Sequence, residues 1–181
     1  MKKMFRPFWS FDVKKTENWL HRMALEGYQF VKLDVVTRLF YFKETDDIKE
    51  IQYHLEYGKD KQETLPMGLV KSGWLPAYQS VRWNVIYNEN TVADILSFPV
   101  RDGVVKRNRR MMYIFAGMTM YILLTTLLFL ILSGFTLFVS GGTLTFEGSI
   151  FWISAFMLGF IIWLLAPYGV VKLYQTNKQF W

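Results

Sequence analysis

Two histidines are the side chains best suited to acid–base or metal chemistry in this chain of 181 residues. His21 falls beside the apolar stripe of a predicted helix, and His54 falls on the outward-alternating face of a predicted strand. They could pair with each other or with Glu17 and Glu56. Two histidines and scattered carboxylates lack the spacing of a metal site. We therefore interpret both as ordinary surface or boundary residues.

An acidic cluster is the second group with chemical potential; its members are Glu44, Asp46, Asp47 and Glu50. It lacks the alternating ligands and the glycine of a calcium loop, so we interpret it as a solvated turn. The chain has no cysteine, which excludes thiolate catalysis and Cys-ligated metals. It also lacks a nucleophile elbow, a phosphate-binding glycine loop and a dinucleotide fingerprint. We predict no enzyme activity, no catalytic residue, no metal and no cofactor.

Aromatic side chains make up 18% of the sequence, more than one face of a small sheet would bury comfortably. Most of them should form the core, because aromatic residues dominate burial energetics. The remainder would line an exposed surface that recognises a partner, as rigid rings do in many interfaces. The best candidates for such partner-binding residues are Trp9, Tyr78 and Trp83.

The positive charge of the chain is concentrated just before its apolar part. Residues 1–100 hold 14 Lys and Arg against 13 Asp and Glu, so the signs nearly balance there. The ten residues that follow carry a basic collar of Arg101, Lys106, Arg107, Arg109 and Arg110. Such a collar contacts anionic lipid headgroups or acts as a topology signal. A nucleic-acid partner is not expected, since the first hundred residues show no basic stripe.

Helix and strand periods alternate in the first hundred residues. Asp12 is the expected N-cap of a helix over Val13–Glu26, and Gly27 ends it. Strands are predicted at Tyr28–Val35, Arg38–Lys43 and Glu50–Tyr57. The pattern then repeats, with Gly73-Trp74 in the place of Gly27-Tyr28. These features predict an α+β domain in which two helices cover one face of an antiparallel sheet, and they suggest an internal αββ duplication.

Two apolar runs in the second half are long enough to cross a membrane, which takes about 20 residues. They cover Met111–Val139 and Ile150–Tyr174. Lys and Arg flank them on the outer sides, at the collar and at Lys172 and Lys178, so both termini should be cytoplasmic. The predicted parts are a soluble domain (1–90), a linker with the collar (91–110), a first span (111–139), a short extracytoplasmic loop (140–149), a second span (150–174) and a cytoplasmic tail (175–181).

The soluble half resembles the DUF2812 family over about residues 4–90. The resemblance is carried by Glu17, Trp19-Leu20, Met23-Ala24, Gly27-Tyr28, Phe30, Phe40, Phe42, Tyr53, Gly73-Trp74 and Trp83. It implies an uncharacterised bacterial protein with a soluble amino-terminal domain, often followed by membrane helices, and hence a location in the bacterial plasma membrane. It transfers no catalytic residue. Genes of the family often accompany PadR-type transcriptional regulators, which points to a regulatory or envelope-response role.

We therefore expect a membrane-anchored cytoplasmic interaction or sensor module that binds a protein partner or a small ligand without covalent chemistry. Its partners would be membrane lipids and a protein, either a PadR-type regulator system or another membrane protein. The alternative is a small subunit of an oligomeric channel, transporter or immunity-type complex whose membrane helices are the working part. A homo-oligomer is compatible with either. The absence of charge inside the spans weighs against the alternative.

Overall fold

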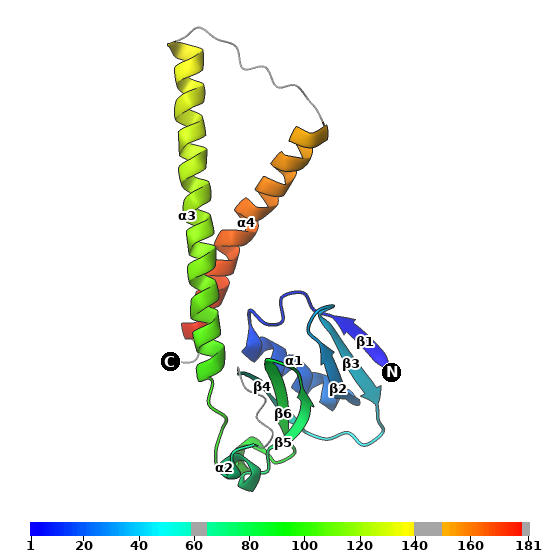
Figure 1. Ribbon diagram of the computed structural model, residues 1–181. Helices are drawn as coiled ribbons and strands as arrows, with labels where there is room; N and C mark the ends of the chain where they lie inside the picture. The colour runs from blue at the N-terminus through cyan, green and yellow to red at the C-terminus, as the bar shows by residue number, and fades with distance from the viewer. Residues whose placement is uncertain (59–64, 140–149, 179–181) are drawn as a thin grey trace. The chain divides into compact units, whose positions relative to one another are not determined.

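The computed structural model describes residues 1–58, 65–139 and 150–178. The chain forms two compact units, one of residues 1–108 with the C-terminal residues from Thr176, and one of residues 109–175. The first unit holds the six strands of the described residues, and the second consists of long helical segments (Figure 1). The predicted loop over residues 140–149 lies outside the described residues.

The strands of the first unit form two antiparallel sheets of three strands each. Sheet A has the order β1-β3-β2, with β1 at Lys2–Phe5, β2 at Tyr28–Asp34 and β3 at Leu39–Glu44. Sheet B has the order β4-β6-β5, with β4 at Gln52–Tyr57, β5 at Leu75–Gln79 and β6 at Trp83–Asn88. The predicted α+β class is confirmed, and the strands are divided between two sheets.

The two sheets are copies of one βαββ unit. In each copy the first strand pairs with the third, and the helix between the first and second strands ends at a glycine with positive φ, Gly27 at 82° and Gly73 at 84°. The helices are α1, Val13–Leu25, and the shorter α2, Met67–Lys71. Both second strands also shift register at the same distance from that glycine, between Phe30 and Lys32 and between Pro76 and Tyr78. The duplicated unit therefore includes the strand before each helix.

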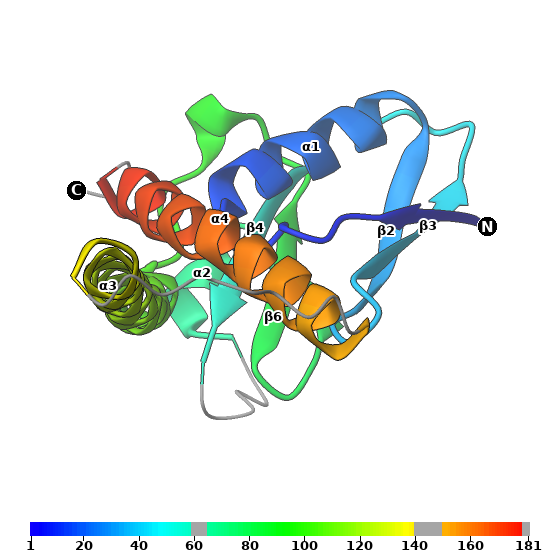
Figure 2. The same ribbon diagram turned by 90° about the horizontal axis from the view of Figure 1, so that it is seen from above.

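Helix α1 lies beside both sheets, against β2 and β4 (Figure 2). The Asp12 carboxylate accepts the N–H of Lys15 and starts the helix. The main core is made of α1 and the facing sides of both sheets, with buried side chains that include Leu20, Met23, Phe40, Leu55 and Val85. A second, smaller core on the other side of sheet B consists of Trp74, Ile86 and Ile95.

Two of the three aromatic residues expected at an exposed surface belong to the main core. Trp9 and Trp83 are only 4% and 5% exposed, and their ring centroids lie 4.6 Å apart. Tyr78 is half-buried and packs against the same core. The expectation of exposure is wrong for both tryptophans, because two sheets face this core and together bury more rings than the single sheet face assumed from the sequence.

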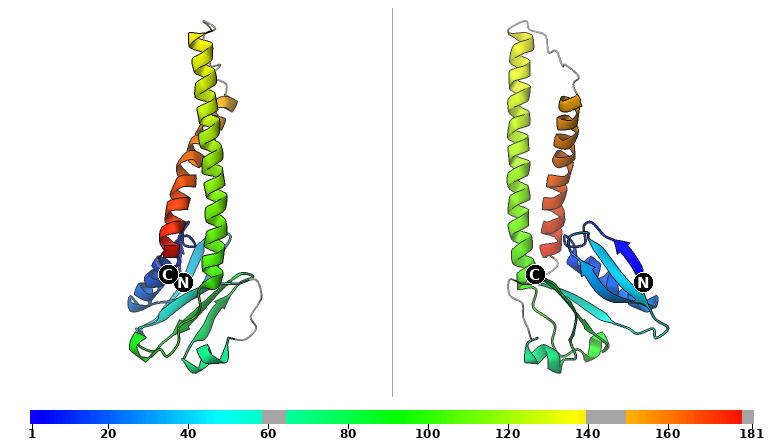
Figure 3. Two further views of the ribbon diagram at one scale, coloured as in Figure 1. Left: turned by 90° about the vertical axis from the view of Figure 1, so that its left-hand side faces the viewer. Right: turned by 45° about the vertical axis from the view of Figure 1, so that its right-hand side comes forward.

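Two helices are long and apolar enough to cross a membrane: α3, Asp102–Phe138, and α4, Ile150–Lys178. At 1.5 Å per residue, the 37 residues of α3 span about 55 Å, well beyond a hydrocarbon core of about 30 Å. The helix is continuous from the collar into the apolar run (Figure 3). Its first residues, up to Asn108, belong to the α+β unit. A short 3₁₀ helix at Val92–Asp94 precedes it.

Candidate functional site

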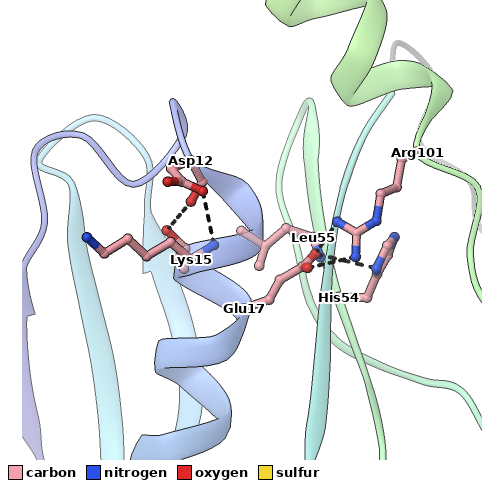
Figure 4. Close-up of polar contacts among 7 residues, drawn as sticks. Asp12, Lys15, Glu17, His54, Leu55 and Arg101 are labelled. Atoms are coloured by element: carbon pink, nitrogen blue, oxygen red, sulfur yellow. Dashed lines mark hydrogen bonds and ion pairs between the residues drawn. The ribbon is translucent and has the colours of Figure 1, made fainter. Parts of the chain in front are cut away.

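A buried carboxylate on α1 joins three parts of the α+β unit. The side chain of Glu17 is 6% exposed, and it accepts the N–H of Leu55 at 2.8 Å. Arg101 donates to both carboxylate oxygens, at 3.0 Å and 2.8 Å. The Nδ1 atom of His54 lies 3.4 Å from the same oxygen that accepts Leu55. Figure 4 shows the guanidinium and the imidazole converging on this carboxylate.

The position of Glu17 follows from the packing of α1 beside β4. Among the described strands, β4 pairs with β6 alone, so no described strand pairs with its other edge. Glu17 accepts the Leu55 N–H of this edge, and the Nδ1 atom of His21, one helical turn later, lies 2.9 Å from the Ile51 carbonyl oxygen. The two side chains therefore satisfy the edge of β4 as a neighbouring strand would.

The outward position predicted for His54 is wrong, since the residue is 3% exposed. It lies opposite Ile86 on the face of sheet B that the second core covers, and its ring centroid is 6.0 Å from that of Trp74. Burial, together with the charge of Arg101, lowers the pKa of His54 to about 3. The imidazole is therefore neutral at pH 7. We assign its proton to Nδ1, which faces Glu17, whereas Nε2 is buried without a hydrogen-bond partner in the described part of the chain.

The pKa of the Glu17 carboxyl group is subject to opposing effects. Burial raises the pKa of Glu17, while the hydrogen bonds and charge of Arg101 and the N–H of Leu55 act in the opposite direction. A buried charge with fewer partners would be strongly unfavourable. Loss of Arg101 from the pair would leave Glu17 without the positive charge that donates hydrogen bonds to both of its oxygens. A displacement of Arg101 would therefore change the hydrogen bonds and charge balance of Glu17, which links α1 to β4.

The neutral state of His54 predicts a loss of stability in mild acid. Below its ordinary pKa of 6.5 the unfolded chain takes up a proton at His54, while the folded protein does not until about pH 3. This difference should remove about 1.4 kcal/mol of stability per pH unit below 6.5. The raised pKa of Glu17 acts in the opposite sense. Its contribution to folding stability is present at low pH and is lost as the pH rises through the pKa of Glu17 in the folded protein.

Comparison of the wild type with His54→Gln isolates the histidine. Denaturant unfolding of both proteins between pH 7 and pH 5 should give a shallower acid loss for the variant, whose amide can still donate to Glu17. Parallel pH profiles for the two proteins would show that His54 is already protonated in the folded state.

The basic collar divides into two sets. Arg101 is committed to Glu17, and Arg107 donates to the Ser10 carbonyl oxygen at 2.9 Å and to its hydroxyl at 3.1 Å. The Arg107 guanidinium also lies 5.0 Å from the ring centroid of Trp83. Both arginines, expected at lipid headgroups, thus bind the α+β unit. The remaining three side chains are exposed and stay predicted headgroup or topology residues; these are Lys106, Arg109 and Arg110.

The first turn of α3 is built into the α+β unit. Val104 is 1% exposed and belongs to the main core. Gly103 lies so close to Tyr57 that an added Cβ would fall 1.7 Å from the Tyr57 carbonyl oxygen. At the other end of the chain, the hydroxyl of Thr176 in α4 donates to the carbonyl oxygen of Phe11 at 2.9 Å. Ends of both long helices are therefore held by the α+β unit.

Comparison with known protein families shows to which family the chain belongs. The model of the family described as "Protein of unknown function (DUF2812)" matches residues 12–118, more than half of the sequence. The chain belongs to this family. The DUF2812 match runs from the cap of α1 at Asp12 into α3, so it starts later and ends later than the 4–90 expected from the resemblance. It includes Glu17, His54, Arg101 and Gly103. No curated protein and no solved structure matches the chain.

One feature in the sequence of this DUF2812 protein indicates the Glu17 site. Glu17 lies four residues after Val13 and three before Leu20, on the apolar stripe of α1. A carboxylate in such a position has to be buried with partners or turned away from the core. Pairing of Glu17 with His54 was one of the arrangements open from the sequence. Arg101 was missed, because 84 residues separate it from Glu17 and its place in the collar suggested a lipid contact.

Proposed function

We propose that this DUF2812 protein is a membrane-anchored regulatory module that passes the state of its α+β unit to its first membrane helix. The observation that carries the proposal is that α3, long and apolar enough to cross a membrane, begins inside the packed core. A flexible linker would only tether a domain. Here Val104, Gly103 and the pair between Arg101 and Glu17 hold the start of the helix in place.

The module would work by non-covalent binding. A protein partner or a small ligand that moves α1 relative to β4 would disturb the hydrogen bonds of Glu17, and through Arg101 the disturbance would reach the start of α3. The same contacts act in the opposite direction, since coupling between two sites is reciprocal. The anchored chain would lie in the bacterial plasma membrane with both termini in the cytoplasm, where a regulator or another membrane protein is within reach.

The second candidate is a membrane subunit whose helices do the work. It is favoured by the large apolar side chains that remain exposed along α3 and α4, such as Leu128, Phe129, Phe160 and Leu164. Lipid would cover them in an anchor, and further copies or other subunits would cover them in a complex. Exchange of both apolar runs for unrelated spans separates the two. A regulatory phenotype that survives the exchange shows that the native sequence of the spans is not the working part, and its loss supports the membrane subunit.

The two-pass arrangement can be tested by cysteine labelling, because the natural chain has no cysteine to interfere. An impermeant maleimide should label Ser149→Cys on intact cells, since this position lies in the predicted extracytoplasmic loop. Val92→Cys, which is 54% exposed in the α+β unit, should react only after lysis. Labelling of Val92→Cys on intact cells would contradict the proposed orientation.

A further inference from the structure

The outer face of sheet A is an open surface that carries several lysines. Side chains alternate along a strand, so Met4, Phe40 and Phe42 turn toward the main core. The residues between them form the opposite face, which we call the basic face: Lys3, Phe5, Lys32, Leu39, Tyr41 and Lys43. All six are exposed or half-buried.

Three lysines of the basic face surround its central ring. Lys3 and Lys32 stand opposite Tyr41 on either side of it, and their Nζ atoms lie 5.6 Å and 4.6 Å from the ring centroid. Lys43 follows two positions along β3. The acidic residue on this side of β2 is Asp34, whose carboxylate accepts the N–H groups of Val36 and Thr37. The face therefore has a net positive charge beside an exposed phenyl ring, Phe5, at 63%.

The equivalent faces of the two βαββ copies carry different residue types. In sheet B the corresponding face, turned away from α2, holds Tyr53, Leu55 and Val85, and these are buried in the main core. The same βαββ unit thus uses this face for packing in its second copy. In the first copy the face carries lysines, which favours a charged, hydrated partner over another apolar layer.

We propose that the basic face of sheet A binds the anionic phospholipid headgroups of the membrane that anchors the chain. Lysine ammonium groups are compact point charges suited to a diffuse anionic surface, and an exposed phenylalanine adds an apolar contact at the interface. The proposal rests on the proposed anchoring, because two membrane helices keep the face at a high effective concentration near lipid. It replaces part of the headgroup contact first assigned to the collar, where Arg101 and Arg107 are occupied by protein groups.

A fluorophore on the face can test this in the full-length protein. Gln29 is exposed and lies opposite Lys43, so Gln29→Cys places a label on the basic face. The labelled protein is reconstituted in nanodiscs of phosphatidylcholine with or without about one third phosphatidylglycerol, both containing a headgroup-linked quencher. Quenching should be strong with phosphatidylglycerol and weak without it, and high salt should reduce it. A label at Val92→Cys serves as the reference position.

Removal of the lysines should reduce the quenched population. Each lysine near an anionic surface changes the binding constant about fivefold, so Lys3→Gln, Lys32→Gln and Lys43→Gln together should lower it about a hundredfold. The matched control removes the exposed Lys14, Lys15 and Lys71, which lie on helices α1 and α2, and should have little effect.

Three results would overturn the inference: equal quenching in neutral and anionic nanodiscs, no quenching in either, or the same loss in the control triple variant. Co-elution of the protein with the nanodisc reports anchoring independently. A chain that fails to co-elute contradicts the proposed function, whereas one that co-elutes without charge-dependent quenching contradicts only the lipid contact.

Discussion

Substitution of Glu17 by alanine should lower the free energy of unfolding of the α+β unit by about 3–5 kcal/mol, the range for breaking a buried ion pair from one side. The change removes the acceptor of the Leu55 N–H and the counter-charge of Arg101 in one step. Unfolding of the full-length protein in detergent, followed by tryptophan fluorescence, measures the loss, because Trp9 and Trp83 lie in the main core.

A double-mutant cycle separates the energy of the Glu17–Arg101 ion pair from that of the hydrogen bond between Glu17 and the edge of β4. Arg101→Met alone leaves the buried carboxylate without its counter-charge and should also destabilise the protein. The variant with both Glu17→Gln and Arg101→Met should lose less stability than the sum of the losses of Glu17→Gln and Arg101→Met alone, with an interaction energy of about 1–3 kcal/mol. Additive effects, or a Glu17→Ala variant within about 0.5 kcal/mol of the wild type, would show that the pair contributes little.

Alanine at Gly103 should destabilise the contact between the start of α3 and the α+β unit by about 2–3 kcal/mol or more. Its Cβ would fall 1.7 Å from the Tyr57 carbonyl oxygen, a backbone atom that cannot rotate away. The clash has to be relieved by moving the helix or β4. Denaturant unfolding should show the loss, and the tryptophan emission of the folded variant should change, since Arg107, four residues later, lies over Trp83.

The matched control is Gly117→Ala in the same helix, where an added Cβ meets no atom within 4 Å. Alanine is the better helix former, so this variant should be as stable as the wild type or more stable. Equal behaviour of the two glycine variants would contradict a packed start of α3.

Local patterns predicted much of the α+β unit. The helix expected at Val13–Glu26 is observed at Val13–Leu25, and its cap at Asp12 and stop at Gly27 are both present. The strand expected at Arg38–Lys43 is observed at Leu39–Glu44. These features depend on residues within one turn or one strand of each other, so the periodicity of apolar side chains and the position of glycine suffice to place them.

Long-range features could not be predicted in the same way. No local pattern tells whether the six strands form one sheet or two, and the burial of Trp9 and Trp83 depends on that division. The collar shows the same limit, because the charges of Arg101 and Arg107 were visible but their partners, Glu17 and Ser10, are 84 and 97 residues away. A basic flank before an apolar run is typical of a membrane helix, and that interpretation hid the packing role of these two residues.

Hydrogen exchange in the full-length protein, reconstituted in nanodiscs, measures whether the α+β unit holds the start of α3. Amide exchange would be compared in the wild type and in Glu17→Gln. We expect the variant to exchange faster in β4 and in residues 102–108, with no change in α3 beyond Met118, because Arg101 links Glu17 to the start of the helix. Faster exchange confined to α1 and β4, with residues 102–108 unchanged, would contradict the coupling and leave α3 as a simple anchor.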